Sequence, residues 1–215
     1  MEKKPHRQMN GELEVYSIFR RRKARGNDGD GNPFIYALKG LNRYSISKEE
    51  LWRFRPNYRR ILGDFMGREP HDRIVPMPSS KPIARYVART AKRCQQESQL
   101  DVSLFRKRTM GEVLPEIEAK LGSGEIPEKF HRDTKQLLSV LSKSPASEFS
   151  MKHVPQTLRG FVSPLALNND IDVTDAKILL VDDLLSSGTT LRTAHELLMS
   201  AGASSVSALC LLSRV

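Results

Sequence analysis

Runs of apolar residues alternate with amphipathic stretches along this chain, a pattern that predicts an α/β fold. The apolar run 178–181 has no polar alternation, which predicts a strand buried on both faces, as in a parallel sheet covered by helices. After a short polar loop, apolar residues recur at spacings of three and four over 191–201, which predicts a helix that ends at Gly202. Asp182 and Asp183 lie where the strand should surface, so this unit combines two acids with a helix start.

Earlier stretches predict further elements. Residues 1–12 are polar and expected to be poorly ordered, and residues 13–19 alternate apolar and polar, which predicts a half-buried strand. Residues 34–66 are helical in pattern, with Ser47 as N-cap and Glu50 three residues later.

Several aromatic residues occupy the second part of that helical stretch. Trp52 and Tyr58 could stack on a base. Aromatic residues at helical spacing usually belong to the core, so we predict both of them there.

A second strand–loop–helix unit begins at residue 73. The apolar segment 73–76 predicts a short strand, and a helix is expected to start at Pro82. Ser79, Ser80 and Lys81 lie between them, where a second anion could bind at a helix start. An ordinary proline-rich turn with a surface lysine is the alternative.

The rest of the chain predicts two more strands and a polar segment. Residues 100–105 alternate like a strand, and residues 204–212 predict a core strand near the C-terminus. Residues 110–153 are polar and weakly helical, and are long enough to suggest an insertion with its own role.

The loop after the predicted strand at 178–181 suits a phosphate. Amides at a helix N-terminus have no partner within the helix and carry the positive end of its dipole. Gly188 allows close approach of the backbone. Hydroxyl donors are supplied by Ser186, Ser187, Thr189 and Thr190. Carboxylates repel phosphate, so Asp182 and Asp183 are expected to hold the hydroxyl groups of a sugar, and a sugar 5-phosphate satisfies both halves.

Other site classes fit this stretch less well. A strand that ends in two aspartates also occurs in nucleotide-binding Walker B segments, but no G-x-x-x-x-G-K-[ST] motif is present. A receiver domain has paired acids too, yet has no reason to follow them with Ser-Ser-Gly-Thr-Thr. A purely structural strand–turn–helix would need only one acid and one glycine.

Composition sets the outer limits. The chain has 215 residues, of which 39% are hydrophobic and 28% charged, as in ordinary soluble domains. No apolar run is long enough to cross a membrane and the start lacks an apolar signal core, so we expect a cytoplasmic protein. Two distant cysteines, Cys94 and Cys210, indicate neither a disulfide framework nor a zinc site.

The net charge of +10 leaves the partner open. A positive field gathers a polyphosphorylated sugar, and it equally suits a nucleic acid. The basic run 20–25 has the same two interpretations, although such runs are more often solvated strand ends. The sequence also leaves a homodimer open.

Leu180-Val181-Asp182-Asp183, followed by Ser186-Ser187-Gly188-Thr189-Thr190, resembles the phosphoribosyl-pyrophosphate (PRPP) signature of type I phosphoribosyltransferases. The resemblance implies that Asp182 and Asp183 are the catalytic acids that hold the ribose 2- and 3-hydroxyls. It also implies that residues 186–190 wrap the 5-phosphate, and that Mg²⁺ enters with the substrate, with the two acids as its candidate protein ligands. Ser186 replaces the threonine often found there.

The same resemblance assigns pyrophosphate to other residues. The loop after the first core strand meets pyrophosphate in this family, and Ser79, Ser80 and Lys81 occupy the matching place. A basic residue of a mobile lid, Arg106 or Arg108, would assist them.

The nearest subgroup in appearance is ComF-like, a group associated with competence and DNA uptake. Residues 32–40, 75–78 and 158–161 carry this likeness, while Glu112 stands where glutamine is common and the zinc ribbon that often precedes such domains is missing. The implied fold is a type I phosphoribosyltransferase-like core with a mostly parallel central sheet flanked by helices.

The expected organisation is an N-terminal hood at 1–70 and a core at 71–215 with a lid or insertion at about 106–157. The expected activity is transfer of 5-phosphoribosyl to an unidentified nitrogen nucleophile. The alternative is a non-catalytic module that senses PRPP or a nucleotide and binds nucleic acid or protein.

Overall fold

The computed structural model describes residues 4–21, 34–40, 43–79, 81–168 and 171–213. The chain divides into two compact units, one of Met1–Leu104 with Asp172–Val215 and the other of Phe105–Ile171. Ser80, residues 22–25 of the basic run and residues 32–33 of the ComF-like stretch lie outside the described residues.

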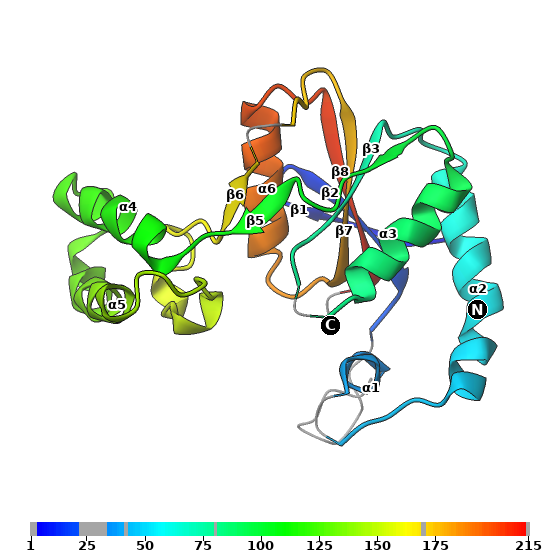
Figure 1. Ribbon diagram of the computed structural model, residues 1–215, viewed down its shortest axis with the longest axis horizontal. Coiled ribbons are helices and arrows are strands. Elements are labelled where there is room, and N and C mark those ends of the chain that lie inside the picture. Colours follow the sequence, from blue (N-terminus) through cyan, green and yellow to red (C-terminus); the bar gives the residue numbers. More distant parts are fainter. Residues whose placement is uncertain (1–3, 22–33, 41–42, 80, 169–170, 214–215) are drawn as a thin grey trace. The chain divides into compact units, whose positions relative to one another are not determined.

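The first unit is a mixed α/β structure around a six-stranded sheet (Figure 1). In chain order its elements are β1 (His6–Asn10), β2 (Leu13–Phe19), α1 (Phe34–Lys39), α2 (Lys48–Met66), β3 (Arg73–Pro76), α3 (Ile83–Cys94), β4 (Gln99–Leu100), β7 (Lys177–Leu184), α6 (Thr189–Ser200) and β8 (Ser205–Leu212). The strand order is β1-β2-β8-β7-β3-β4, with β1 antiparallel to β2 and every other neighbouring pair parallel. The predicted fold class is therefore confirmed.

Helices cover the central strands. One core cluster joins α2 and α3 to the sheet through residues such as Leu62, Val87 and Leu179. Helix α6 turns Leu191 and Leu198 inward and contacts β8. Residues 178–181 are fully buried, as expected of a parallel strand with helices on both sides.

The second unit has a core of its own. It contains β5 (Phe105–Lys107) paired antiparallel with β6 (Leu165–Leu167), α4 (Met110–Gly122) and α5 (His131–Lys143). Three short 3₁₀ helices complete it: Glu128–Phe130, Met151–His153 and Gln156–Leu158. Buried apolar residues from both helices meet Phe149, which is 1% exposed.

Local sequence signals correctly predicted the start of α2 and the end of α6. Ser47 and Glu50 form the predicted capping box at the start of α2. Gly202 adopts the predicted left-handed conformation, with φ of 92°. Among the described residues, no helix is both long and apolar enough to span a bilayer.

Several predictions about local structure were wrong. Residues 6–10, within the segment expected to be poorly ordered, form β1 because they pair with β2 at the sheet edge. Residues 101–104 are not a strand. Trp52 is 62% exposed rather than buried, whereas Tyr58 is 7% exposed, as predicted. Strand β7 continues through both aspartates to Leu184, because it pairs with β8 as far as Leu212.

Candidate functional site

The two acids lie near the carboxyl end of β7, a central strand of the sheet. Asp182 is partly buried and Asp183 is 5% exposed. The amide of Asp183 donates a hydrogen bond of 2.8 Å to Asp182 Oδ1. Because consecutive side chains of a strand point to opposite faces, the acids leave the strand in different directions.

The environment of Asp182 favours its protonated form. Burial, and then the neighbouring charge of Asp183, raise the pKa of Asp182 to about 7. The hydrogen bond from the Asp183 amide and the charge of Lys39 act in the opposite direction. Without a ligand, Asp182 therefore changes its charge close to neutral pH.

Lys39 neutralises the second acid. Its Nζ lies 2.7 Å from Asp183 Oδ2, and the side chains are 22% and 8% exposed. The contact is an ion pair whose angles are not those of a directed hydrogen bond. Lys39 is the last residue of α1, so the end of this short helix places a positively charged side chain beside the acid pair.

The loop after β7 leads into α6 with unpaired amides. Ser186 and Ser187 are exposed, and within the described part of the chain their amides and that of Gly188 have no acceptor. The hydroxyls of Ser187 and Thr189 lie 3.1 Å apart. This is the arrangement that a phosphate group needs: free backbone donors beside hydroxyl donors at the N-terminus of a twelve-residue helix.

Gly188 fixes the shape of this loop. Its φ of 72° is left-handed, and a Cβ at this position would collide with the side-chain amide of Asn10. Asn10 Nδ2 donates a hydrogen bond of 2.9 Å to the Gly188 carbonyl. The last residue of β1 therefore holds the loop from the edge of the sheet.

The second predicted anion loop starts at the same edge of the sheet. Pro76 at the end of β3 pairs with Val181, and the Met77 amide donates a hydrogen bond of 2.8 Å to the Val181 carbonyl. Ser79 and Lys81 are exposed, and the Lys81 amide donates to Ser79 Oγ at 3.3 Å. The topology thus brings the start of this loop beside the strand that carries the acids.

The remaining predicted pyrophosphate ligands belong to the other unit. Arg106 makes a bidentate contact with Glu112, at 2.9 and 2.6 Å, and Arg108 is paired with Glu116. Arg106, then the Thr109 amide, lower the pKa of Glu112 to about 2. Glu112 also closes the capping box at the start of α4 with Thr109. Both arginines therefore have acidic partners within their own unit.

Three residues at the site were not predicted from the sequence. Lys39 and Asn10 are far from the motif in sequence, and although Lys39 lies in the ComF-like stretch 32–40, nothing in that stretch predicted its ion pair with Asp183. Cys210 pairs in register with Asp182 on the neighbouring strand, and burial, then the charges of the two acids, raise the pKa of its thiol. Only the register of the sheet reveals this cysteine.

The donor set is compatible with Mg²⁺ carried by a substrate. No group of three or more His, Cys, Asp or Glu side chains is arranged for a metal in the described residues. The acid pair offers two carboxylates, one of them engaged by Lys39. Mg²⁺ is commonly held by one or two carboxylates together with substrate phosphates, so the residues fit such an ion.

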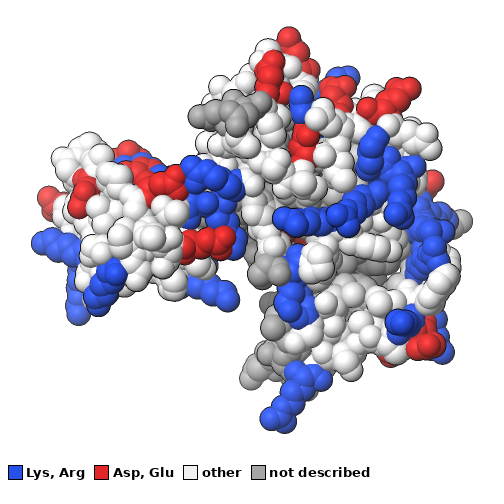
Figure 2. Space-filling model, in the orientation of Figure 1, with Lys and Arg blue, Asp and Glu red and all other residues white. Residues whose placement is uncertain are grey.

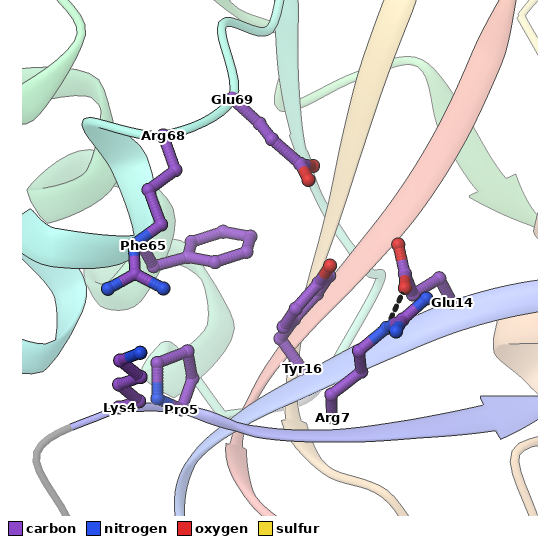
Figure 3. A pocket seen from close by; sticks show the side chains of 8 residues that line it. All are labelled: Lys4, Pro5, Arg7, Glu14, Tyr16, Phe65, Arg68 and Glu69. Carbon is purple, nitrogen blue, oxygen red and sulfur yellow. Dashed lines mark hydrogen bonds and ion pairs between the residues drawn. The ribbon is translucent and has the colours of Figure 1, made fainter.

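A separate cavity of about 470 Å³ lies against β1, β2 and the end of α2 (Figure 3). Its lining comprises Lys4, Pro5, Arg7, Glu14, Tyr16, Phe65, Arg68 and Glu69. Arg7 and Glu14 neutralise one another there. The cavity contains none of the predicted site residues.

Comparison with known proteins supports the motif. Residues 126–215 match the family model described as the phosphoribosyl transferase domain. The matched segment includes β7 with both acids, the loop 185–188, α6 and β8. No curated protein matches the chain. The segment that carries the acid pair and the helix start thus matches a phosphoribosyl transferase domain, which supports the type I phosphoribosyltransferase family and phosphoribosyl transfer as the general activity.

Proposed function

We propose that this protein transfers the 5-phosphoribosyl group of PRPP to a nitrogen nucleophile and releases pyrophosphate. The observation that carries the proposal is the pairing of two carboxylates with a loop of free amides and hydroxyls, on one strand–loop–helix unit inside the matched segment. We also propose the ComF-like subgroup, on the residues that resemble it.

In this proposal different loops of the chain bind different groups of PRPP. The amides and hydroxyls of residues 186–190 bind the 5-phosphate, and Asp182 and Asp183 accept hydrogen bonds from the ribose hydroxyls. Ser79, Ser80 and Lys81 bind the pyrophosphate, with Arg106 or Arg108 contributing from a lid at about 106–157. Residues 1–70 act as a hood.

The reaction breaks the bond from the anomeric carbon to the pyrophosphate oxygen, which leaves with the electron pair, and forms a bond from that carbon to nitrogen. Positive charge develops on the ribose ring as the bond breaks, and ionised carboxylates beside the ring stabilise it. When bound, Mg²⁺ supplies charge neutralisation for the departing pyrophosphate.

We propose that Lys39 changes partner when the substrate binds. A ribose hydroxyl at Asp183 Oδ2 would compete with the Lys39 ammonium group, which lies 2.7 Å from that oxygen. The freed ammonium group is then available to the phosphate oxygens of the substrate. Lys39 therefore balances the charge of the acid pair before binding.

The experiment is calorimetric titration of the protein with PRPP and Mg²⁺, followed by measurement of pyrophosphate release with a panel of nucleobases and amines. Asp182→Asn should weaken PRPP binding at least about tenfold, because it removes a charged acceptor. Asp64→Asn, which alters an exposed acid on α2, is the matched control. Equal affinity in wild type and Asp182→Asn would refute the assignment.

A second candidate is a non-catalytic module in which the same site senses PRPP. The ion pair between Lys39 and Asp183 favours it, because a ligand that breaks this contact would shift α1 without any chemistry. PRPP binding, with no release of pyrophosphate from PRPP in the presence of any acceptor tested, would select this candidate.

A further inference from the structure

A groove of about 800 Å³ lies between α1, α2 and α3, in the unit that carries the acid pair. Its floor is aliphatic and aromatic: Phe19, Phe34, Leu38, Leu51, Ile83, Val87 and Leu211 all contribute. The acids do not line it, although Leu38, which does, is the chain neighbour of Lys39, the ion-pair partner of Asp183. A surface of this character is expected to meet apolar groups of a partner.

Large apolar side chains stand exposed at this groove. Trp52 is 62% exposed, Tyr86 61% and Phe54 42%. They come from two different helices, α2 and α3, yet line the same depression. Trp52 was wrongly predicted to be a core residue, because the apolar face of α2 extends beyond the core into an open groove.

The rim of the groove is cationic. Arg55, Arg85 and Arg89 line it, and no acidic residue does so in the described part of the chain. Helix α3 contains no acid at all from Ile83 to Cys94. Figure 2 shows Lys and Arg side chains gathered over α2 and α3 on the face drawn. A complementary partner is therefore apolar along its centre and acidic along its flanks.

The aromatic rings are already partly engaged. The Arg55 guanidinium lies 4.2 Å from the centre of the Trp52 ring, and Tyr86 stacks on Tyr58 with ring centres 6.4 Å apart. Single-stranded nucleic acids bind by stacking bases on free aromatic faces. Partly engaged rings beside an apolar lining of aliphatic and aromatic side chains suit the side chains of an amphipathic helix better.

We propose that this groove binds an acidic amphipathic helix of a partner protein. Apolar side chains at positions i, i+3 or i+4, and i+7 of that helix enter the groove, and its Asp and Glu side chains meet Arg55, Arg85 and Arg89. The interaction does not depend on the proposed transferase activity.

The probe is a synthetic helix of about 16 residues, with Leu and Phe on one face and Glu on the other. Trp52 is the single tryptophan of the chain, so its emission reports directly on the groove. Titration of the full chain with the peptide should give a saturable blue shift. A fluorescein-labelled peptide gives the affinity by anisotropy.

Two charge reversals test the rim. Arg85→Glu and Arg89→Glu should each weaken peptide binding about three- to tenfold, and the loss should shrink at high salt. Arg93→Glu is the matched control, because it is exposed on the same helix but does not line the groove. Leu51→Asp tests the floor at an exposed position, 38% accessible, where folding should survive.

Several outcomes would overturn the proposal. A scrambled peptide of the same composition that binds equally well would show simple charge attraction. Binding of an oligo-dT strand in preference to the peptide would make this a nucleic-acid surface. An equal effect of Arg93→Glu and Arg89→Glu, or an absent Trp52 shift, would exclude the groove as the binding site.

Discussion

Asp182 should reduce the stability of the folded protein at neutral and alkaline pH, and Asp182→Asn should relieve this. The pKa of this carboxyl is raised from 3.8 to about 7 in the folded protein, first by burial and then by Asp183. A raised acid pKa means that the folded state binds the proton more tightly than the unfolded state. Its stabilising contribution is therefore complete below pH of about 4 and is lost as pH rises through about 7.

The size of the effect follows from the shift. A difference of about three pKa units corresponds to roughly 4 kcal/mol between the two protonation states. Asp182 is only partly buried, so solvent screening reduces this, and we expect about 2 kcal/mol. Asparagine cannot ionise, so the variant should lack this pH-dependent loss.

Urea unfolding of wild type and Asp182→Asn at intervals from pH 5 to 8.5 tests this reasoning. The stability of the variant relative to wild type should rise with pH from pH 5 to about 7 and level off above about pH 7, where the carboxyl is ionised in both the folded and the unfolded state. Asp64→Asn on the exposed face of α2 controls for loss of a negative charge from a basic chain. A difference that stays constant across this range, or a variant less stable than wild type at pH 8, would refute the argument.

Three further predictions concern the site and the second unit. Lys39→Met should cost about 3 kcal/mol of stability, because it leaves Asp183 buried without its cation. In a double-mutant cycle measured by urea unfolding, adding Asp183→Asn should recover most of this loss. A cycle that shows no coupling between the two residues would contradict the ion pair. Gly188→Ala should cost about 1–2 kcal/mol of stability in thermal unfolding, because the φ of this residue is positive, and calorimetry should show weaker PRPP binding. Adding Asn10→Ala should relieve only the collision between the new Cβ and the Asn10 side chain. Phe149→Ala should cost about 3–5 kcal/mol and increase amide hydrogen exchange in residues 105–171, and uniform exchange across both units would argue against a separate core.

Patterns local in sequence were predicted correctly. The apolar run of β7, the capping box of α2 and the left-handed Gly202 each depend on a few adjacent residues and on backbone rules that hold in any fold. The strand, the loop and the helix start around Asp182 and Asp183 were also predicted, because these three elements are contiguous in the chain.

Contacts between distant segments were not predictable in this way. The contacts of Lys39 with Asp183 and of Asn10 with Gly188 arise only in the tertiary structure, since residues 39 and 10 are far from the motif in sequence and β2 and β8 lie between β1 and β7 in the sheet. The burial of Trp52 was mispredicted because helical periodicity identifies an apolar face but not how far that face is covered.

The sequence by itself thus predicted the fold class and most of the elements, and it placed two acids and a loop of small hydroxyl residues in one strand–loop–helix unit. The tertiary structure decided the charge state of that unit, because burial is the largest cause of the raised pKa of Asp182, and because Lys39 pairs with Asp183. It also decided which apolar residues remain at the surface. Both depend on what packs against a residue from elsewhere in the chain, and spacing along the sequence does not contain that information.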